Sequence, residues 1–148
     1  MADNPDRALI EEMMAYGYSD VAVDTNPVFA DLGARIVTAA RGKITLRFSV
    51  GKRSRQGDGI IHGGVISTML DGGMAFAVLS MLDAGESAAT ISLTVNFLGA
   101  AGEGDCEVGA TVERIGQRVA FTRATLTSDT GKPVATATAA FAVLRPRS

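Results

Sequence analysis

The stretch that decides the fold is Ile60–Leu82, with the sequence IIHGGVISTMLDGGMAFAVLSML. It is long, apolar and rich in glycine, yet it carries two ionisable residues, His62 and Asp71. A carboxylate in apolar surroundings is costly to bury unless it finds hydrogen-bonding or ionic partners. An acid in the middle of such a run therefore indicates a residue with a functional role.

The bulk composition limits the class of protein. The chain has 148 residues, and we expect one domain over residues 1–148, with residues 1–18 as an N-terminal helical extension. Hydrophobic residues make up 47% and charged residues 20%, which excludes a disordered chain. The formal net charge of −2 argues against a nucleic-acid partner. Cys106 and His62 are the only cysteine and histidine, so an intrachain disulfide and a zinc site of the usual composition are excluded.

The N-terminal sequence MADNPDRALIEEMMAY is acidic and amphipathic and lacks the apolar core of a signal peptide, so we expect a cytoplasmic protein. The run Ile60–Leu82 is long enough to span a bilayer. However, Asp71 lies at its centre, and a helix buried under a sheet explains the run without placing a charge in lipid. We therefore expect no membrane partner.

The rest of the chain is predicted to form a sheet around this run. A short helix is expected from Asn4 to Tyr16, and one helical turn near Phe29. Alternation of apolar and polar residues predicts strands at 34–40, 43–50, 90–97, 105–114, 118–127 and 134–144. Strands joined by short turns form an antiparallel sheet, whose apolar face must cover the central helix. The prediction is an α+β protein with the hotdog fold, a curved antiparallel sheet wrapped around one long central helix.

His62-Gly63-Gly64 stands at the predicted start of the central helix. Backbone amides there lack helical acceptors, and glycine allows close approach, so this end can hold an anion or a developing oxyanion. Asp71 lies eight residues later, about 12 Å along the helix axis, so both groups cannot reach one carbonyl carbon. They converge if two copies of the helix lie antiparallel across a two-fold axis. A catalytic Asp71 therefore predicts a homodimer.

The pattern Gln56, His62-Gly63-Gly64 and Asp71 resembles the acyl-CoA thioesterases of the hotdog superfamily, closest to the PaaI-like (phenylacetate-pathway) branch. The strand sequence TISLTVNFL at 90–98 resembles the family's strand after the helix, and the similarity covers roughly residues 27–144. Many PaaI-like members carry asparagine where Gln56 stands, although a related 4-hydroxybenzoyl-CoA group has glutamine there.

The resemblance implies hydrolysis of an aryl- or alkyl-acyl-CoA to the free acid and CoA. By it, the Gly63 amide polarises the thioester carbonyl, with Gln56 nearby, and Asp71 of the facing chain acts as nucleophile or general base. His62 supports the loop, and Thr90 hydrogen-bonds the carboxylate or the water. Coenzyme A is part of the substrate, so no cofactor is expected. The expected partners are the acyl-CoA and further copies of the chain, in a homodimer or in a dimer of dimers (homotetramer).

Each candidate residue also has a structural interpretation. Asp71 is alternatively a buried acid capped by the hydroxyls of Ser67 or Thr68. The glycine pair alternatively permits close helix packing, a histidine before such a pair is more often structural, and Thr90 is one of four alternating polar strand residues. Two groups of basic residues either contact the CoA phosphates or are solvated. The first group is Lys52, Arg53 and Arg55, and the second is Arg114, Arg118 and Arg123.

Two other functions remain open. A hotdog hydratase or dehydratase would use a histidine–carboxylate pair, with His62 reaching the α or β carbon of the acyl chain. A non-catalytic protein that binds acyl-CoA as a signal would need an output module, and we expect none to fit within 148 residues.

Overall fold

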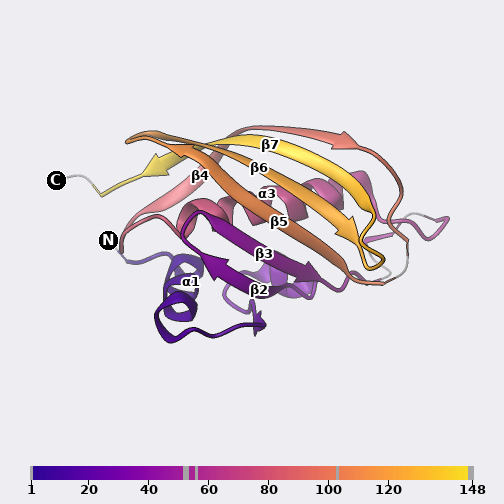
Figure 1. The fold of residues 1–148 in the computed structure, drawn as a ribbon, viewed down its shortest axis with the longest axis horizontal. Helices are drawn as coiled ribbons and strands as arrows, with labels where there is room; N and C mark the ends of the chain where they lie inside the picture. Colours follow the sequence, from indigo (N-terminus) through magenta and orange to yellow (C-terminus); the bar gives the residue numbers. More distant parts are fainter. Residues whose placement is uncertain (1, 52–53, 56, 103, 147–148) are drawn as a thin grey trace.

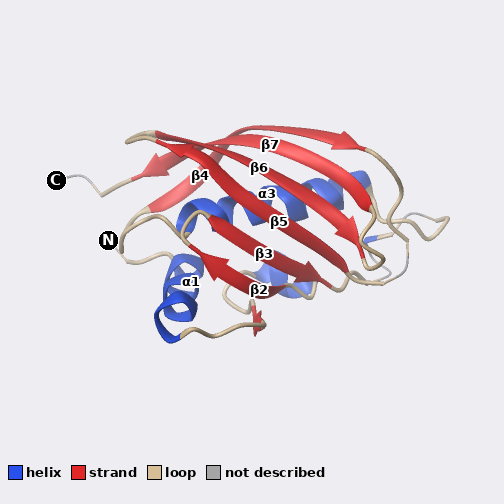
Figure 2. Cartoon of the chain, in the orientation of Figure 1, coloured by secondary structure: helices blue, strands red, loops and turns tan. Residues whose placement is uncertain are grey.

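A computed structural model gives the structure of the chain and describes residues 2–51, 54–55, 57–102 and 104–146. The strands form one antiparallel sheet in the order β1-β2-β3-β5-β6-β7-β4 (Figure 2). The predicted fold class, an antiparallel sheet around one central helix, is confirmed. In chain order the elements are α1 (Pro5–Tyr16), β1 (Val21–Ala22), α2 (Pro27–Asp31), β2 (Arg35–Ala40), β3 (Lys43–Phe48), α3 (Gly63–Leu79), β4 (Ser87–Phe97), β5 (Cys106–Ile115), β6 (Val119–Ser128) and β7 (Pro133–Leu144).

The core lies between α3 and the concave face of the sheet, which curves over the helix (Figure 1). Most of α3 is buried, including Met69, Leu70 and Phe76. Burying a side chain of this size contributes about 1.5–3 kcal/mol. Among the described residues, no helix is long and apolar enough to cross a membrane.

Element boundaries differ from the predicted ones by a few residues. The central helix begins at Gly63, as predicted, and Ile61 pairs with Arg55 in an isolated β-bridge before the chain turns into α3. The helical turn expected near Phe29 is α2, whereas the two-residue strand β1 was not predicted. Two residues are too few to show a periodicity, so β1 left no signal in the sequence.

Two glycines beside Asp71 let α3 pack closely against its neighbours. A Cβ placed on Gly72 would lie 1.6 Å from Cζ of Phe29 on α2, and one on Gly73 would lie 2.6 Å from a methyl carbon of Val108 on β5. These separations are far below van der Waals contact, so neither position has room for a side chain. The aromatic ring of Phe29 thus fixes α2 against the middle of α3.

We expect Gly72→Ala to destabilise the protein by about 1–3 kcal/mol through overpacking, partly offset by the higher helix propensity of alanine. Urea unfolding measures the loss. The matched background is Phe29→Leu, which shortens the side chain that the new methyl group meets, so Gly72→Ala should be less destabilising there. An equal loss in both backgrounds would show that the contact with Phe29 is not the cause.

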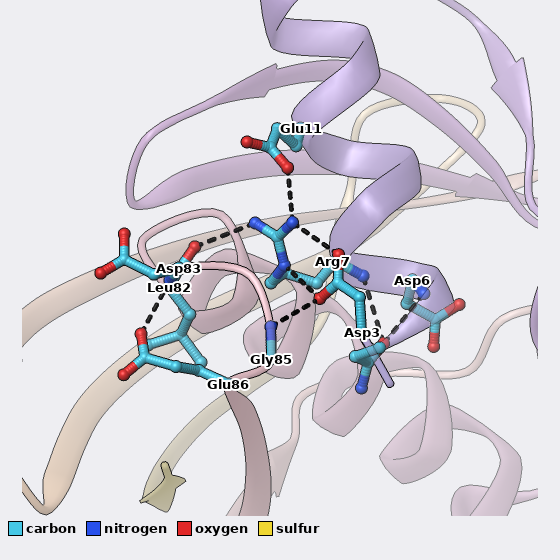
Figure 3. A network of polar contacts seen from close by, with 9 residues as sticks. Asp3, Asp6, Arg7, Glu11, Leu82, Asp83, Gly85 and Glu86 are labelled. Carbon is cyan, nitrogen blue, oxygen red and sulfur yellow. Dashed lines mark hydrogen bonds and ion pairs between the residues drawn. The ribbon is translucent and has the colours of Figure 1, made fainter. Parts of the chain in front are cut away.

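Helix α1 is held against the loop that follows α3 by a polar network around Arg7, whose side chain is buried (Figure 3). Nε and Nη2 of Arg7 each donate to the Asp3 carboxylate at 2.7 Å, Nη1 donates to the carbonyl of Leu82 at 3.1 Å, and Nη2 also pairs with Glu11. The Asp3 carboxylate accepts a further bond from the Gly85 amide at 3.1 Å. These bonds, chiefly those from Arg7, hold the pKa of Asp3 well below its usual range.

A carboxyl group whose pKa is lowered on folding stabilises the protein above its ordinary pKa of about 4, and this stabilisation is lost as the pH falls toward the folded value. We therefore expect Asp3→Asn to lower the melting temperature at neutral pH and to make it fall less steeply below about pH 4. Thermal unfolding followed by circular dichroism over a pH series measures both effects. Asp24→Asn, at an exposed position outside the network, is the control. If the difference in melting temperature between the wild type and Asp3→Asn stayed constant down to acid pH, this account would be contradicted.

Candidate active site

The first turn of α3 leaves two glycine amides without a helical acceptor. The carbonyl of His62, the N-cap residue, accepts from the amides of Val65 at 3.0 Å and Ile66 at 3.1 Å. Within the described part of the chain, no acceptor is paired with the amides of Gly63 or Gly64. These N–H groups stand at the positive end of the helix dipole and are free to bind an oxyanion.

The surroundings of the two glycines differ from each other. A Cβ on Gly63 would meet the ring of Phe97 at 3.2 Å, and that ring is 53% exposed. A Cβ on Gly64 would have nothing within 4 Å. Packing within the chain therefore does not require glycine at position 64, and this weakens the interpretation that the pair serves only close helix packing.

The segment that leads into α3 is held by the side chain of Arg55. Its guanidinium donates to the backbone carbonyls of Val50 at 3.3 Å, Gly59 at 3.0 Å and Gly102. Arg55 thus holds two loops together, and a contact with CoA phosphates stays a prediction. Backbone bonds add to this link, from Ile61 to the carbonyl of Ala101 at 2.8 Å and from His62 to that of Ser54 at 2.9 Å.

Several candidate residues from the sequence fall elsewhere. Gln56, Lys52 and Arg53 lie outside the described residues. The side chain of His62 is exposed and makes no capping hydrogen bond, although its backbone caps the helix. Nine residues, about 13 Å of helix axis, separate it from Asp71. Within one chain, His62 and Asp71 are therefore too far apart to form the histidine–carboxylate pair that a hydratase would need.

Asp71 is half-buried on α3, and its carboxylate oxygen Oδ1 accepts a hydrogen bond of 2.8 Å from the hydroxyl of Thr90 on β4. The hydroxyls of Ser67 and Thr68 do not cap it. They donate instead to the carbonyls one turn earlier, at 2.9 Å and 3.0 Å. The predicted capping of Asp71 by Ser67 or Thr68 is therefore wrong, and the hydroxyl group that Asp71 accepts from is that of Thr90.

A bulge in β4 turns Thr90 toward Asp71. Thr90 pairs with Phe141 of β7 but Ser92 pairs with Ala140, so Ile91 is an extra residue in the register. Paired residues lie on the same side of a sheet, and Phe141 is fully buried on the helix-facing side. Thr90 consequently faces α3, whereas Ile91, which was predicted to face the core, is 58% exposed.

A cavity of about 460 Å³ opens beside the start of α3, next to Gly63. Its wall is formed by the entry to the helix and the end of β4, and the lining is mostly apolar. Phe97 lines this cavity together with Gly63, and an added Cβ on Gly63 would lie 3.2 Å from its ring. The lining residues are Ile60, Ile61, Gly63, Ile66, Phe97, Leu98, Gly99 and Ala100.

Comparison with known proteins identifies the family. Residues 58–135, more than half of the chain, match the family model described as the thioesterase superfamily. Over 90 residues, the chain is 31% identical to a Pseudomonas aeruginosa protein named as an esterase. This match covers 60% of this chain and 67% of that protein. The chain belongs to the thioesterase superfamily, and it is a hydrolase that acts on thioesters.

Solved structures share the fold over nearly the whole chain. A thioesterase family protein from Silicibacter pomeroyi matches with a TM-score of 0.80 at 27% identity, over 95% of this chain and 99% of that one. A thioesterase from Ralstonia eutropha, described as a phenylacetic acid degradation-related protein, matches with a TM-score of 0.77 at 30% identity, over 88% and 97%. The hotdog fold and the resemblance to PaaI-like thioesterases are thereby confirmed.

Proposed function

We propose that the protein is an acyl-CoA thioesterase that acts as a homodimer, with Asp71 of one protomer and the Gly63 amide of the other in each site. The observation that carries this proposal is the half-buried Asp71 carboxylate, which is hydrogen-bonded to Thr90 and lies on the same helix as the free glycine amides. A carboxylate and an oxyanion-binding end are the two groups that thioester hydrolysis requires.

The geometry of α3 supports the proposed dimer. Gly63 and Asp71 are about 12 Å apart along one helix. If α3 of a second protomer lies antiparallel to it, Gly63 of each protomer is opposite Asp71 of the other, and two equivalent sites form. The two-fold axis then passes beside Ser67, midway between them. The exposed and half-buried residues that share this face of α3 are Gly64, Thr68, Asp71 and Ala75, and their small side chains allow close approach.

The edge of the sheet supports the same arrangement. β4 is the last strand of the sheet, and it pairs on one side with β7. A long unpaired edge is a template for another strand. Because Thr90 of this edge strand contacts Asp71, a second chain that pairs with β4 also approaches the carboxylate.

In the proposed reaction, the thioester carbonyl oxygen accepts a hydrogen bond from the Gly63 amide, which stabilises the negative charge that develops there. Asp71 of the facing chain then acts in one of two ways. As a nucleophile it attacks the carbonyl carbon, CoA leaves as the thiolate, and water hydrolyses the mixed anhydride. As a general base it accepts a proton from the water that attacks. Single-turnover hydrolysis in oxygen-18 water tests the nucleophilic route, because the label enters the Asp71 carboxylate when water attacks the Asp71 carbonyl of the mixed anhydride.

Coenzyme A as the leaving group is supported by a related fold. A Streptococcus mutans protein of the same fold, with a TM-score of 0.69 and 24% identity over 76% of this chain and 90% of that one, was solved bound to acetyl-CoA. The ligand belongs to that protein. For this chain it supports the choice of an acyl-CoA as the first thioester to test.

The test is a panel of aryl- and alkyl-acyl-CoA thioesters incubated with the protein and a thiol-reactive chromophore. We expect CoA release matched by an equal amount of free acid. Release from no member of the panel would overturn the proposal. Consumption of an enoyl-CoA without CoA release would instead support the hydratase.

A further inference from the structure

The hydroxyl group of Ser67, one turn into α3, donates a hydrogen bond of 2.9 Å to the carbonyl oxygen of Gly63. This carbonyl and the N–H group of Gly64 belong to the same planar peptide group. We propose that the Gly64 amide is a second donor to the oxyanion, and that Ser67 is the positioning residue that strengthens this donor. The inference rests on the proposed thioesterase function and adds two residues to its site.

The rotation of α3 places Gly64, rather than Gly63, on the side of the helix that carries Asp71. An α-helix turns by about 100° per residue, so the seven residues from Gly64 to Asp71 fall about 20° short of two full turns. The eight residues from Gly63 to Asp71 leave Gly63 about 80° away from it. In the proposed dimer the Asp71 side of α3 faces the partner, so the Gly64 amide lies on the side where the shared site forms.

The space around the two glycines favours Gly64 as well. Gly64 is exposed, and a Cβ there would have no neighbour within 4 Å. Gly63 is half-buried beside the ring of Phe97. A carbonyl oxygen therefore approaches Gly64 without displacing a side chain of the same chain. Successive N–H groups at a helix N-terminus can bind one anion together, so the two glycine amides can share one oxyanion.

The bond from Ser67 acts on this donor through the peptide group. When the carbonyl of a peptide group accepts a hydrogen bond, the N–H of the same group becomes a stronger donor, by about 10–30% per bond. Within the described residues, the Gly64 N–H has no paired acceptor. The polarisation that Ser67 causes is therefore available to a bound oxyanion.

Thr68 makes the same kind of bond one residue later and offers an internal comparison. Its hydroxyl donates at 3.0 Å to the carbonyl of Gly64, in the peptide group whose N–H belongs to Val65. The Val65 amide already donates to the carbonyl of His62 at 3.0 Å. Polarisation by Thr68 therefore strengthens a bond within the helix, whereas polarisation by Ser67 acts on an amide that is free for a ligand.

The first experiment measures turnover. One oxyanion donor contributes about 10²–10³-fold to kcat, and about 10–30% of that free energy corresponds to about 2- to 8-fold. We therefore expect Ser67→Ala to lower kcat by about 2- to 8-fold with little change in KM. Ser67→Thr, which keeps a hydroxyl group able to bond the same carbonyl, should restore kcat. An equal loss in Ser67→Thr would overturn the role of the hydroxyl group.

A double-mutant cycle assigns the effect to one amide. Gly63→Pro removes the N–H of Gly63 and leaves that of Gly64, so Ser67→Ala should lower kcat by the same factor in this background as in the wild type. If Ser67 acted through the Gly63 amide, its effect would disappear there. That outcome would overturn the assignment to Gly64.

The second experiment reports on the donors directly, by infrared spectroscopy of acetyl-CoA labelled with carbon-13 at its carbonyl. Asp71→Asn holds this thioester without turnover, and the band of the labelled carbonyl moves to lower frequency as the donors to its oxygen strengthen. In this background Ser67→Ala should move the band to higher frequency, Ser67→Thr should return it, and Thr68→Val should leave it unchanged. An equal shift in Thr68→Val, or no shift in Ser67→Ala, would overturn the proposal.

Failure of this inference is distinguishable from failure of the proposed function. If the wild type released CoA from no thioester, the proposed function would be overturned, and the carbonyl band of bound acetyl-CoA would still decide whether Ser67 strengthens the Gly64 amide. If CoA were released and Ser67→Ala changed neither kcat nor the band, the role of Ser67 would be overturned and thioester hydrolysis would stand.

Discussion

Asp71→Asn should slow CoA release by about 10²–10⁴-fold, the range that a positioned acid–base group contributes. Asparagine has the size of aspartate and keeps an oxygen that accepts the hydroxyl of Thr90, so the contact of 2.8 Å survives. It lacks the negative charge, and therefore it neither attacks a carbonyl carbon nor takes a proton from water. The loss should appear in kcat, with little change in binding, because the substitution acts on the reacting atoms.

Three measurements make this prediction specific. Thermal unfolding should show a melting temperature close to that of the wild type, because the half-buried side chain keeps its shape. Inhibition by free CoA should be unchanged, since in the proposed reaction the carboxylate acts on the acyl carbonyl rather than on CoA. Thr90→Val, which removes the hydroxyl group and retains the carboxylate, should have a smaller effect on kcat. A kcat of Asp71→Asn equal to that of the wild type would contradict the proposed mechanism.

The fold could be predicted because its two periodicities are strong. α3 is one apolar run interrupted by a single acid, and β3 alternates through Ile44, Leu46 and Phe48, all fully buried. The bulge in β4 could not be predicted, since Thr90 and Ile91 suit either face of a strand. The extra residue shifts the alternation of sides between the two parts of the strand, so that Thr90, paired with Phe141, and Leu93, paired with Ala139, lie on the same helix-facing side.

The candidate site was predictable where its groups lie on one element. The glycine amides and Asp71 share α3, so their separation followed from helix geometry alone. Contacts between distant segments left no such signal. Arg55 reaches a carbonyl 47 residues away, and Phe29 meets Gly72 across the fold. Loop arginines and isolated aromatic residues are common in any sequence, and only the folded chain shows which carbonyl or glycine they contact.

Gly63→Pro should lower kcat by about 10²–10³-fold, the usual loss when one oxyanion donor is removed. Proline removes the backbone N–H and adds its ring, and it suits this position because Gly63 is the first residue of α3, where proline is favoured. His62 has ψ 139°, which is the extended conformation that a following proline requires. Gly63→Ala is the matched control, since it makes the same new contact with the exposed ring of Phe97 but keeps the N–H group. Equal losses in the two variants would assign the effect to the ring of Phe97 rather than to the amide.

Mixing the two inactive variants tests whether the site is shared between chains. In a heterodimer of Asp71→Asn and Gly63→Pro protomers, one site combines the intact Gly63 amide with the intact carboxylate, and the other site has neither. Random exchange of protomers in equal amounts should therefore restore about one quarter of the wild-type rate. Protomers carrying different affinity tags confirm the exchange. If both groups acted within one chain, no mixture would regain activity, so a mixture that stays inactive after proven exchange would refute the shared site.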